Sequence, residues 1–405
     1  MRTNKKRVLV LTSTFPRWKK DITPPFVFEL ESRLAKDFDI YILAPHYEGA
    51  KKYEINNNLK IYRFQYFWPA KLQKLCYGGG ILPRLNKNKL LVLQIFPFLL
   101  SELIWAIRII KKEKIQLIHA HWLIPQGFVA VLINKMHKIP YIVTAHGGDI
   151  YGFRSEIFIR LKKFILNNAK IITVVSNTLK RDLLNKINPT FNIKVISMGV
   201  DTILFHPNRY SPTIKEKYVI RGPFLLFVGS LVEKKGVKYI LLAMSKILIK
   251  YPTAKLIIIG DGEERESLKN LANKLSIRSQ ISFLGAIPNN KLPPFYATAD
   301  LFISPSIITD NGDREGLPVT FLEASCSGCI PIGTNVGGIS EIIKDGASGF
   351  IVKQKDASEI AARVITLLKN QDLRSKLSKN ARKATINKYS WSIITKHHSN
   401  LYSDL

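Results

Sequence analysis

The chain has 405 residues, of which 46% are hydrophobic and 22% charged, so it is long enough for two globular domains and too apolar to be disordered. Its formal net charge of +31 favours an anionic partner. Because three cysteines are too few for a disulfide framework and the apolar run at 8–11 is too short for a signal peptide, we expect the protein to stay in the cytoplasm.

The first half of the chain alternates apolar strands with longer helical segments. We predict strands at residues 8–12, 40–43, 60–64, 116–119, 141–144 and 171–174, and helices at 26–36 and 90–111. Such alternation predicts a doubly wound parallel sheet. The window 90–107 approaches membrane-spanning length but contains Pro97 and Glu102, so we expect a buried or interfacial helix there.

The same pattern starts again after Pro207. We predict strands at residues 224–228, 255–259, 280–284 and 301–303, again with helices between them. Two stacked α/β domains follow from this repetition, one at 1–206 and one at 207–388. Ligands of such sheets bind beyond the carboxyl ends of the strands, so we expect the site in a cleft between the two domains.

The positive charge is concentrated in the first half. Residues 1–206 hold 33 Lys and Arg against 13 Asp and Glu, whereas 207–405 hold 28 against 17. Within 51–100, nine basic residues and one acid alternate with aromatic side chains, a composition that suits an anionic membrane surface. No known nucleic-acid-binding motif accompanies the charge, so we expect no nucleic acid partner. A lysine-rich proteome could also account for the whole excess.

The segment 313–324 places two acids, Glu315 and Glu323, around a glycine and a proline. Pro318 suits the first turn of a helix, which leaves Glu315 in the loop before it and Glu323 inside it. A helix N-terminus beside Gly316 can bind a phosphate group. Glu323 then lies roughly 7.5 Å further along the helix axis, where it could accept from both ribose hydroxyls, while Glu315 faces a sugar. The alternative is an ordinary amphipathic helix with a solvated acid in front of it.

Other polar residues follow the ends of predicted strands. Lys235 lies in a glycine-bounded turn before a helix and could meet a diphosphate, although a lone loop lysine is usually solvated. His146 ends a strand and precedes two glycines, which favours close approach to a ligand at the cleft. His119 and His121 lie on one face of a strand, but no acid cluster completes a site, so we expect no metal. The segments lack a dinucleotide-binding glycine fingerprint, which disfavours a nicotinamide enzyme.

Taken in order, these segments resemble the retaining GT-B glycosyltransferases of the family-4 type, and the resemblance covers nearly the whole chain. Its centre is the family's pair of glutamates with seven residues between them, matched by Glu315 and Glu323. The supporting matches are Gly229 with 233–236, 260–262, 299–301, 337–338 with Glu341, 346–350, 146–149 and 199–201 with Phe205. Residues 15–17 and 24–27 are similar to the subgroup that builds cell-surface polysaccharides and lipid-linked oligosaccharides.

The resemblance implies a GT-B fold, in which two Rossmann-like domains face one another across a cleft, and a final helix at 389–405 that crosses back to the first domain. It also implies transfer of a sugar from a nucleotide-diphosphate donor in the second domain to a hydroxyl acceptor in the first, with retention of anomeric configuration. The acceptor would be a lipid-linked glycan at the cytoplasmic face of the membrane, where the protein would be peripheral. No cofactor and no metal are expected.

Residue roles follow from the same resemblance. The catalytic residues would be Glu315, which contacts the donor sugar, Lys235, which stabilises the leaving diphosphate, and His146, which holds the sugar or its phosphate. The donor would also contact Glu323, Gly316, Leu317, Pro318, Gly229, Ser230 and Ile287.

The chain departs from the family pattern in two places. Ser230 stands where many relatives have arginine, so either Lys234 or Arg314 supplies the charge or turnover is weaker. Pro24 and Pro25 replace a glycine pair, so no donor contact is assigned to that loop. Two other functions remain open: a GT-B nucleotide-sugar epimerase, and a non-catalytic basic protein that binds membrane surfaces.

Overall fold

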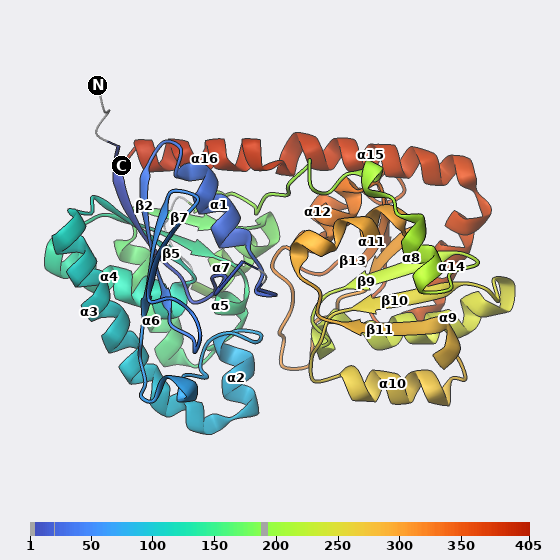
Figure 1. The fold of residues 1–405 in the computed structure, drawn as a ribbon, viewed down its shortest axis with the longest axis horizontal. Coiled ribbons are helices and arrows are strands. Elements are labelled where there is room, and N and C mark those ends of the chain that lie inside the picture. Colours follow the sequence, from blue (N-terminus) through green and yellow to red (C-terminus); the bar gives the residue numbers. More distant parts are fainter. Residues whose placement is uncertain (1–4, 20, 188–192) are drawn as a thin grey trace. The chain divides into compact units, whose positions relative to one another are not determined.

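The computed structural model describes residues 5–19, 21–187 and 193–405. It divides into two compact units (Figure 1). The first unit comprises residues up to 197 together with 394–405, and the second comprises residues 198–393. Each unit has its own sheet, as the restart of the strand pattern after Pro207 predicts.

The first unit is built on an eight-stranded sheet in the order β3-β4-β2-β1-β5-β6-β7-β8. Only β3 runs antiparallel to its neighbour, β4, among the strands of this sheet. The central strands are buried on both faces because helices cover both, which is why they read as continuous apolar runs. The strands are β1 (Arg7–Leu11), β2 (Asp39–Pro45), β3 (Tyr53–Asn56), β4 (Leu59–Phe64), β5 (Leu117–His121), β6 (Tyr141–Ala145), β7 (Ile171–Val174) and β8 (Ile193–Val195).

Helices pack on both faces of this sheet (Figure 1). On one face α3 packs against α4 and α4 packs against α6, and α1 and α16 lie on the other face. The helices are α1 (Phe26–Leu34), α2 (Ile81–Lys87), α3 (Ile95–Glu113), α4 (Phe128–His137), α5 (Gly148–Tyr151), α6 (Glu156–Asn168), α7 (Asn177–Ile187) and α16 (Trp391–Ser403).

The apolar window in the first unit forms a 3₁₀ turn at residues 89–94 followed by α3. Within the described residues, 89–113 is the one helical stretch whose length and apolar composition would allow it to cross a membrane. Core helices of soluble proteins pass the same test, so this is weak evidence for a span. One side of α3, including Phe98, Ala106 and Ile109, is buried against the sheet, as the prediction of a buried or interfacial helix requires.

The second unit contains a six-stranded, wholly parallel sheet in the order β11-β10-β9-β12-β13-β14. The predicted strands are present, and two further short strands, β13 and β14, extend the sheet. The strands are β9 (Phe224–Val228), β10 (Lys255–Ile259), β11 (Ile281–Gly285), β12 (Leu301–Ser304), β13 (Ile330–Thr334) and β14 (Phe350–Val352). The helices are α8 (Pro212–Lys217), α9 (Val237–Lys250), α10 (Arg265–Lys274), α11 (Pro293–Thr298), α12 (Val319–Cys326), α13 (Ile339–Ile342), α14 (Ala357–Lys369) and α15 (Gln371–Tyr389).

The start of α12 corrects one expectation. Pro318 is not in the first turn of the helix; it is the N-cap residue, with φ −76° and ψ 111°, and α12 begins at Val319. The extended backbone of Pro318 turns the chain into the helix one residue later than predicted. The shift leaves the two acids as expected, because Glu315 lies in the preceding loop and Glu323 lies inside α12.

Candidate active site

Three loops meet at the carboxyl ends of β9, β10 and β12 in the second unit. The backbone N–H of Gly229 donates to Ile259 O at 2.9 Å, and that of Ile307 donates to Lys234 O at 2.8 Å. A Cβ on Gly260 would lie 1.8 Å from Gly229 O, and one on Gly236 would lie 2.2 Å from Pro305 O. The glycines are therefore required for the loops to pack backbone against backbone.

Lys235 and Glu315 form an ion pair between two of these loops. Lys235 ends a 3₁₀ turn before α9, and its Nζ lies 3.2 Å from Oε2 of Glu315. Both side chains are nearly buried, so water screens this pair less than it would screen a surface pair. The two residues singled out from separate motifs thus form one group.

The remaining oxygen of Glu315 differs from the one that contacts Lys235. Burial alone would raise the pKa of the Glu315 carboxyl, but the charges of Lys235 and Lys234 outweigh burial and leave that pKa below its usual value. Within the part of the chain that the structure describes, Oε1 of Glu315 is buried and accepts no hydrogen bond. An ionised, buried oxygen without a donor is costly, so this atom is the one best placed to accept from a bound hydroxyl.

A second ion pair supports the same loops. Lys234 Nζ lies 3.1 Å from Oδ2 of Asp313. The Asp313 N–H in turn donates to Asn311 Oδ1 at 3.0 Å. Lys234 is therefore engaged, and in this arrangement its charge is compensated by Asp313.

Glu323 projects from α12 into a separate polar group. Its Oε1 accepts from Nδ2 of Asn289 at 2.7 Å, and its Oε2 accepts from Oη of Tyr296 at 2.9 Å. Burial raises the pKa of Glu323 to about 7, although both hydrogen bonds act in the opposite direction. A carboxylate has about four lone-pair sites, so one acceptor position remains on each oxygen.

The turn after β13 holds the loop that carries Glu315. Gly338 donates its N–H to Gly316 O at 2.7 Å. A Cβ on Gly337, whose φ is +58°, would lie 2.2 Å from Glu315 O. The glycine pair at 337–338 therefore packs against the backbone carbonyls of Glu315 and of the residue after it.

In the first unit, His146 follows β6 at the start of a tight turn. The Asp149 carboxylate accepts from the N–H groups of His146, Gly147 and Leu123, at 3.2, 2.9 and 2.9 Å. Gly147 has φ +118°, which a side chain would strain. Asp149 therefore shapes the backbone that presents His146.

Aromatic rings surround the His146 side chain. Its ring lies 4.7 Å from Trp122 and 5.3 Å from Phe26, measured between centroids. Trp122 has φ +75°, a strained backbone conformation of the kind that gathers at functional sites. Burial, reinforced by His121, lowers the pKa of His146 well below its usual value, so the imidazole is neutral at neutral pH.

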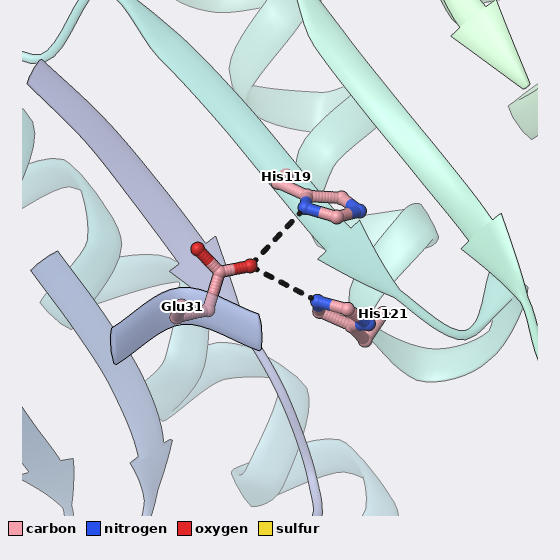
Figure 2. Close-up of side chains that lie close together, drawn as sticks. All are labelled: Glu31, His119 and His121. Carbon is pink, nitrogen blue, oxygen red and sulfur yellow. Dashed lines mark hydrogen bonds and ion pairs between the residues drawn. The ribbon is translucent and has the colours of Figure 1, made fainter. Parts of the chain in front are cut away.

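The two strand histidines meet an acid that the sequence did not indicate. His119 Nδ1 and His121 Nε2 each lie 3.5 Å from Oε1 of Glu31, which projects from α1 (Figure 2). One ligand atom from each of the three lies within 4.8 Å of the others. The argument that no acid completes the histidine pair is therefore wrong, because α1 brings Glu31 onto the face of β5.

Models of two families match the chain. Glycosyltransferase Family 4 matches residues 25–204, and Glycosyl transferases group 1 matches residues 211–384. The chain is also 30% identical over 321 residues to an uncharacterized glycosyltransferase of Methanocaldococcus jannaschii, which covers 75% of this chain and 79% of that relative. The chain belongs to the group 1 glycosyltransferases of the family-4 type.

Two further comparisons agree with this assignment. The glycosyltransferase is 22% identical over 387 residues to a GDP-mannose-dependent alpha-(1-6)-phosphatidylinositol monomannoside mannosyltransferase of Mycolicibacterium smegmatis, with 95% of each chain covered. Its structure resembles that of sucrose-phosphate synthase from Thermosynechococcus elongatus with a TM-score of 0.82, at 19% identity and 99% coverage of both chains. The two parallel-sheet units are thus those of the GT-B fold, as predicted.

The structure brings most of the predicted donor residues of the glycosyltransferase to one end of the second sheet. Gly229 and Ser230 follow β9, and the Ser230 side chain is exposed. Leu317 and Pro318 follow Gly316 directly before α12, and both are buried. Ile287 lies half-buried in the loop after β11, two residues before Asn289, which binds Glu323.

Several neighbours of these residues were not found from the sequence. Asn289 and Tyr296 have no motif that sets them apart from ordinary loop and helix residues. Glu31 and Tyr402 lie on amphipathic helices, where an acid and a tyrosine are common. Trp122 could have been suspected, because it follows the second histidine directly at the end of a buried strand.

A polar hollow of about 590 Å³ in the first unit is not part of this arrangement. It lies at the opposite, amino ends of the strands and is lined by Arg7, Asp39, Tyr41, Lys60, Lys112, Glu113, Lys114 and Gln116. Ligands of open α/β sheets bind at the carboxyl ends of the strands, so the loops are the better candidate for a ligand site than this hollow.

Proposed function

We propose that this glycosyltransferase moves a sugar from a nucleoside-diphosphate sugar to a hydroxyl group, with retention of anomeric configuration, in the synthesis of cell-surface polysaccharide or glycolipid. The observation that supports it best is the buried pair of Glu315 and Lys235, in which one carboxylate oxygen has no donor within residues 5–19, 21–187 and 193–405. A sugar hydroxyl would satisfy that oxygen, and a diphosphate would attract the ammonium group.

The second unit supplies the groups that such a donor needs. Lys235 exchanges its contact with Glu315 for the diphosphate and stabilises the negative charge that grows as the bond from the sugar carbon to the phosphate oxygen breaks. The amides of Gly316 and Leu317, at the N-terminal end of α12, bind a sugar or phosphate oxygen. Glu323 accepts from the ribose, and the backbone near Ile287 receives the base.

His146 of the first unit is proposed to contact the donor sugar. Its low pKa favours a neutral imidazole, which suits a hydroxyl better than a phosphate. Because a lysine and a helix N-terminus offset the diphosphate charge, we propose that no metal and no other cofactor take part. Addition of a chelator is then expected to leave the transfer rate unchanged.

A panel of nucleotide sugars tests the donor assignment directly. The correct donor at 100 times its dissociation constant should stabilise the protein by about 2.7 kcal/mol in a thermal-shift measurement. NMR of the product then reports whether the anomeric configuration of the donor is kept. Release of a new free sugar from donor alone, without acceptor, would instead indicate an epimerase.

We further propose that the acceptor is a lipid-linked glycan and that the first unit binds an anionic membrane surface. The relative from M. smegmatis is named for a phosphatidylinositol mannoside acceptor. In this chain Leu90, Leu93 and Phe96 recur every third residue and are each at least 70% exposed, and exposed patches of apolar side chains mark interaction sites. Lys71 and Lys74 are also exposed. They lie near the apolar residues because the Gln94 side chain hydrogen-bonds the backbone of residues 72 and 74.

Sedimentation with vesicles tests the membrane proposal. Phe96→Asp should weaken binding to anionic vesicles by at least about tenfold, because burying a phenylalanine contributes roughly 1.5–3 kcal/mol. Ile249→Asp is a matched control, since Ile249 is 81% exposed on α9 of the second unit. Equal loss in both variants, or equal binding to neutral and anionic vesicles, would contradict the proposal.

A further inference from the structure

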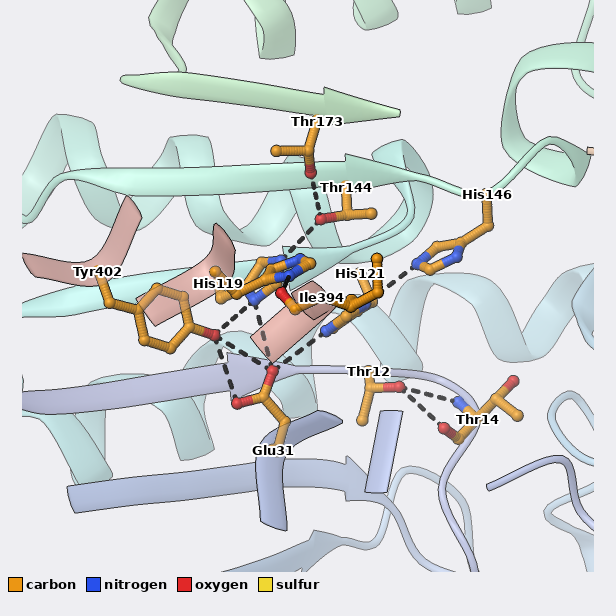
Figure 3. Close-up of polar contacts among 11 residues, drawn as sticks. Thr12, Thr14, Glu31, His119, His121, Thr144, His146, Thr173, Ile394 and Tyr402 are labelled. Carbon is orange, nitrogen blue, oxygen red and sulfur yellow. Dashed lines mark hydrogen bonds and ion pairs between the residues drawn. The ribbon is translucent and has the colours of Figure 1, made fainter. Parts of the chain in front are cut away.

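A network of buried polar side chains lies on the face of the first sheet that α1 and α16 cover (Figure 3). Glu31 is at its centre: its oxygens accept from Oη of Tyr402 at 3.2 and 3.3 Å, and Oε1 lies 3.5 Å from Nε2 of His121. One branch, the His146 branch, continues from Nδ1 of His121 to Nε2 of His146 at 3.0 Å. The other, the Thr173 branch, consists of Tyr402, His119, Thr144 and Thr173.

The proton positions in the Thr173 branch follow from the oxygens of Glu31, which accept from Tyr402. The Tyr402 hydroxyl donates a hydrogen bond to Glu31. The hydroxyl oxygen of Tyr402 therefore accepts from Nδ1–H of His119, 2.6 Å away. With that proton on Nδ1, Nε2 of His119 accepts from the hydroxyl of Thr144 at 2.7 Å. Each donor in this branch therefore points toward Glu31.

The same rule orders the His146 branch. Nε2 of His121 faces Glu31 and must carry a proton, so Nδ1 of a neutral His121 carries a lone pair. That lone pair accepts from Nε2–H of His146. A neutral His146 then has no proton on Nδ1, and among the described residues this atom makes no hydrogen bond.

We propose that Glu31, acting through His121, holds His146 in the tautomer that is protonated at Nε2 and presents the Nδ1 lone pair to a sugar hydroxyl. Glu31 and His121 are positioning residues, since they reach the substrate only through His146. The role of His146 in transfer rests on the proposed function, but its tautomer does not. Tyr402 of α16 donates to the Glu31 carboxylate, so α16 also helps to hold that carboxylate in place.

A metal ion is the competing occupant of the same cluster. Glu31, His119 and His121 offer three ligand atoms close together. A metal bound to Nε2 of His121 would leave the one proton of that neutral ring on Nδ1, which would then donate to Nε2 of His146 and reverse the tautomer of His146. The experiment must therefore measure metal content together with the tautomer.

Nitrogen NMR of the full chain labelled in histidine tests the proposal, with His146 assigned from the spectrum of His146→Gln. In the wild type, Nδ1 of His146 should show the shift of an unprotonated nitrogen and Nε2 that of a protonated one. Glu31→Gln replaces a group that only accepts by an amide that can present either its oxygen or its N–H to His121, so His121 should no longer be held in one tautomer and His146 should show a mixture of tautomers. The same variant should lower kcat by about tenfold with a smaller change in the donor KM.

Thr173→Val is the matched control. Thr173 is buried and ends the other branch, so its loss should leave the His146 shifts and kcat unchanged. If Glu31→Gln does not fold, His121→Asn replaces it: the amide keeps contact with His146 but not with Glu31, and a mixture of His146 tautomers is expected.

Three results would overturn the proposal. They are a proton on Nδ1 of His146 in the wild type, an unchanged His146 tautomer in a folded Glu31→Gln protein, and one equivalent of metal whose removal shifts the signals of His119 and His121. A wild-type protein without transferase activity would instead contradict the proposed function and leave the tautomer test standing.

Discussion

The candidate donor site of the second unit and the histidine network of the first unit use buried polar groups in opposite ways. Glu315 and Lys235 pair across two loops and leave one carboxylate oxygen without a donor. Glu31 instead accepts from Tyr402 on both oxygens and faces two histidines. A charged ligand can replace Glu315 as the partner of Lys235, whereas the hydrogen-bond partners of Glu31 are a tyrosine and histidines, which suits this network to fixing the orientation of a neutral ring.

The largest effect is expected when either member of the ion pair between Lys235 and Glu315 is replaced. Glu315→Gln or Lys235→Met should each lower kcat by at least about a hundredfold, which corresponds to about 2.7 kcal/mol of lost transition-state stabilisation. The double variant should be little worse than either single variant, because the two groups act together. Steady-state kinetics with the donor found by thermal shift measures all three rates.

Lys246→Met is a suitable control for the charge change. Lys246 is exposed on α9 and bonds only the hydroxyl of Ser358 among the described residues, so near-normal kinetics are expected. Rates within a few-fold of wild type for both Glu315→Gln and Lys235→Met would refute the assignment of the donor site.

Glu315 and Lys235 could each be singled out from the sequence, because each belongs to a short local motif. Glu315 precedes a glycine and a proline, and Lys235 follows a buried strand and precedes a glycine. Strand ends in a parallel sheet gather at one edge, which brings such loops together. The sequence did not show that Lys235 and Glu315 touch, because both were assigned to a ligand.

The histidine network could not be predicted in the same way. Glu31 lies 90 residues from His121 and 371 residues from Tyr402, and neither distance has a spacing rule. Glu31 and Tyr402 also lie on helices whose pattern only indicates which side is buried. Short strands such as β3 and β8 were missed for a related reason, since three or four residues carry too little alternation to identify a strand.

The pH dependence of donor binding is the next largest expected effect. Glu323 has a pKa of about 7, and only its ionised form can accept from both ribose hydroxyls. Affinity for the donor should therefore fall as the pH drops through 7, by about tenfold between pH 8 and pH 6. Calorimetric titration at several pH values measures it, and Glu323→Gln should flatten the profile. A wild-type profile that is already flat would remove Glu323 from the ribose site.

Glu102 sharpens the comparison, because it is a buried acid without a lysine. It lies inside α3, where the amide of Gln126 at 3.4 Å is its one hydrogen-bond partner among the described residues, and burial raises its pKa to about 8. Between the ordinary value of 4.5 and about 8 the folded state holds a proton that the unfolded state has released, so stability falls as the pH rises through this window.

Glu102→Gln should remove that part of the pH dependence. The neutral amide keeps the shape of the side chain, so the difference in unfolding free energy between variant and wild type should grow in favour of the variant by up to about 1.4 kcal/mol per pH unit. Urea unfolding at pH 6, 7 and 8 measures this difference. A difference that does not change with pH would show that Glu102 ionises in the folded protein as it does in the unfolded chain.

The smallest expected effect is that of placing a positive charge at residue 230, where many relatives have arginine and this chain has serine. Ser230 stands exposed directly after Gly229, on the same loop as Lys234 and Lys235. Lys234 is already engaged by Asp313, so it does not act as a spare cation. Ser230→Arg should add a positive charge near the leaving diphosphate and raise kcat/KM, but water screening at an exposed position limits the gain to a few-fold.

Salt separates this explanation from an effect on folding. The advantage of Ser230→Arg should shrink as ionic strength rises, because the added charge acts through solvent. Ser230→Gln adds a side chain without charge and should leave the rate near that of wild type. An equal gain from glutamine, or a gain that salt does not reduce, would mean that the loop responds to side-chain size and that the pair of Lys235 and Glu315 already supplies the charge that transfer needs.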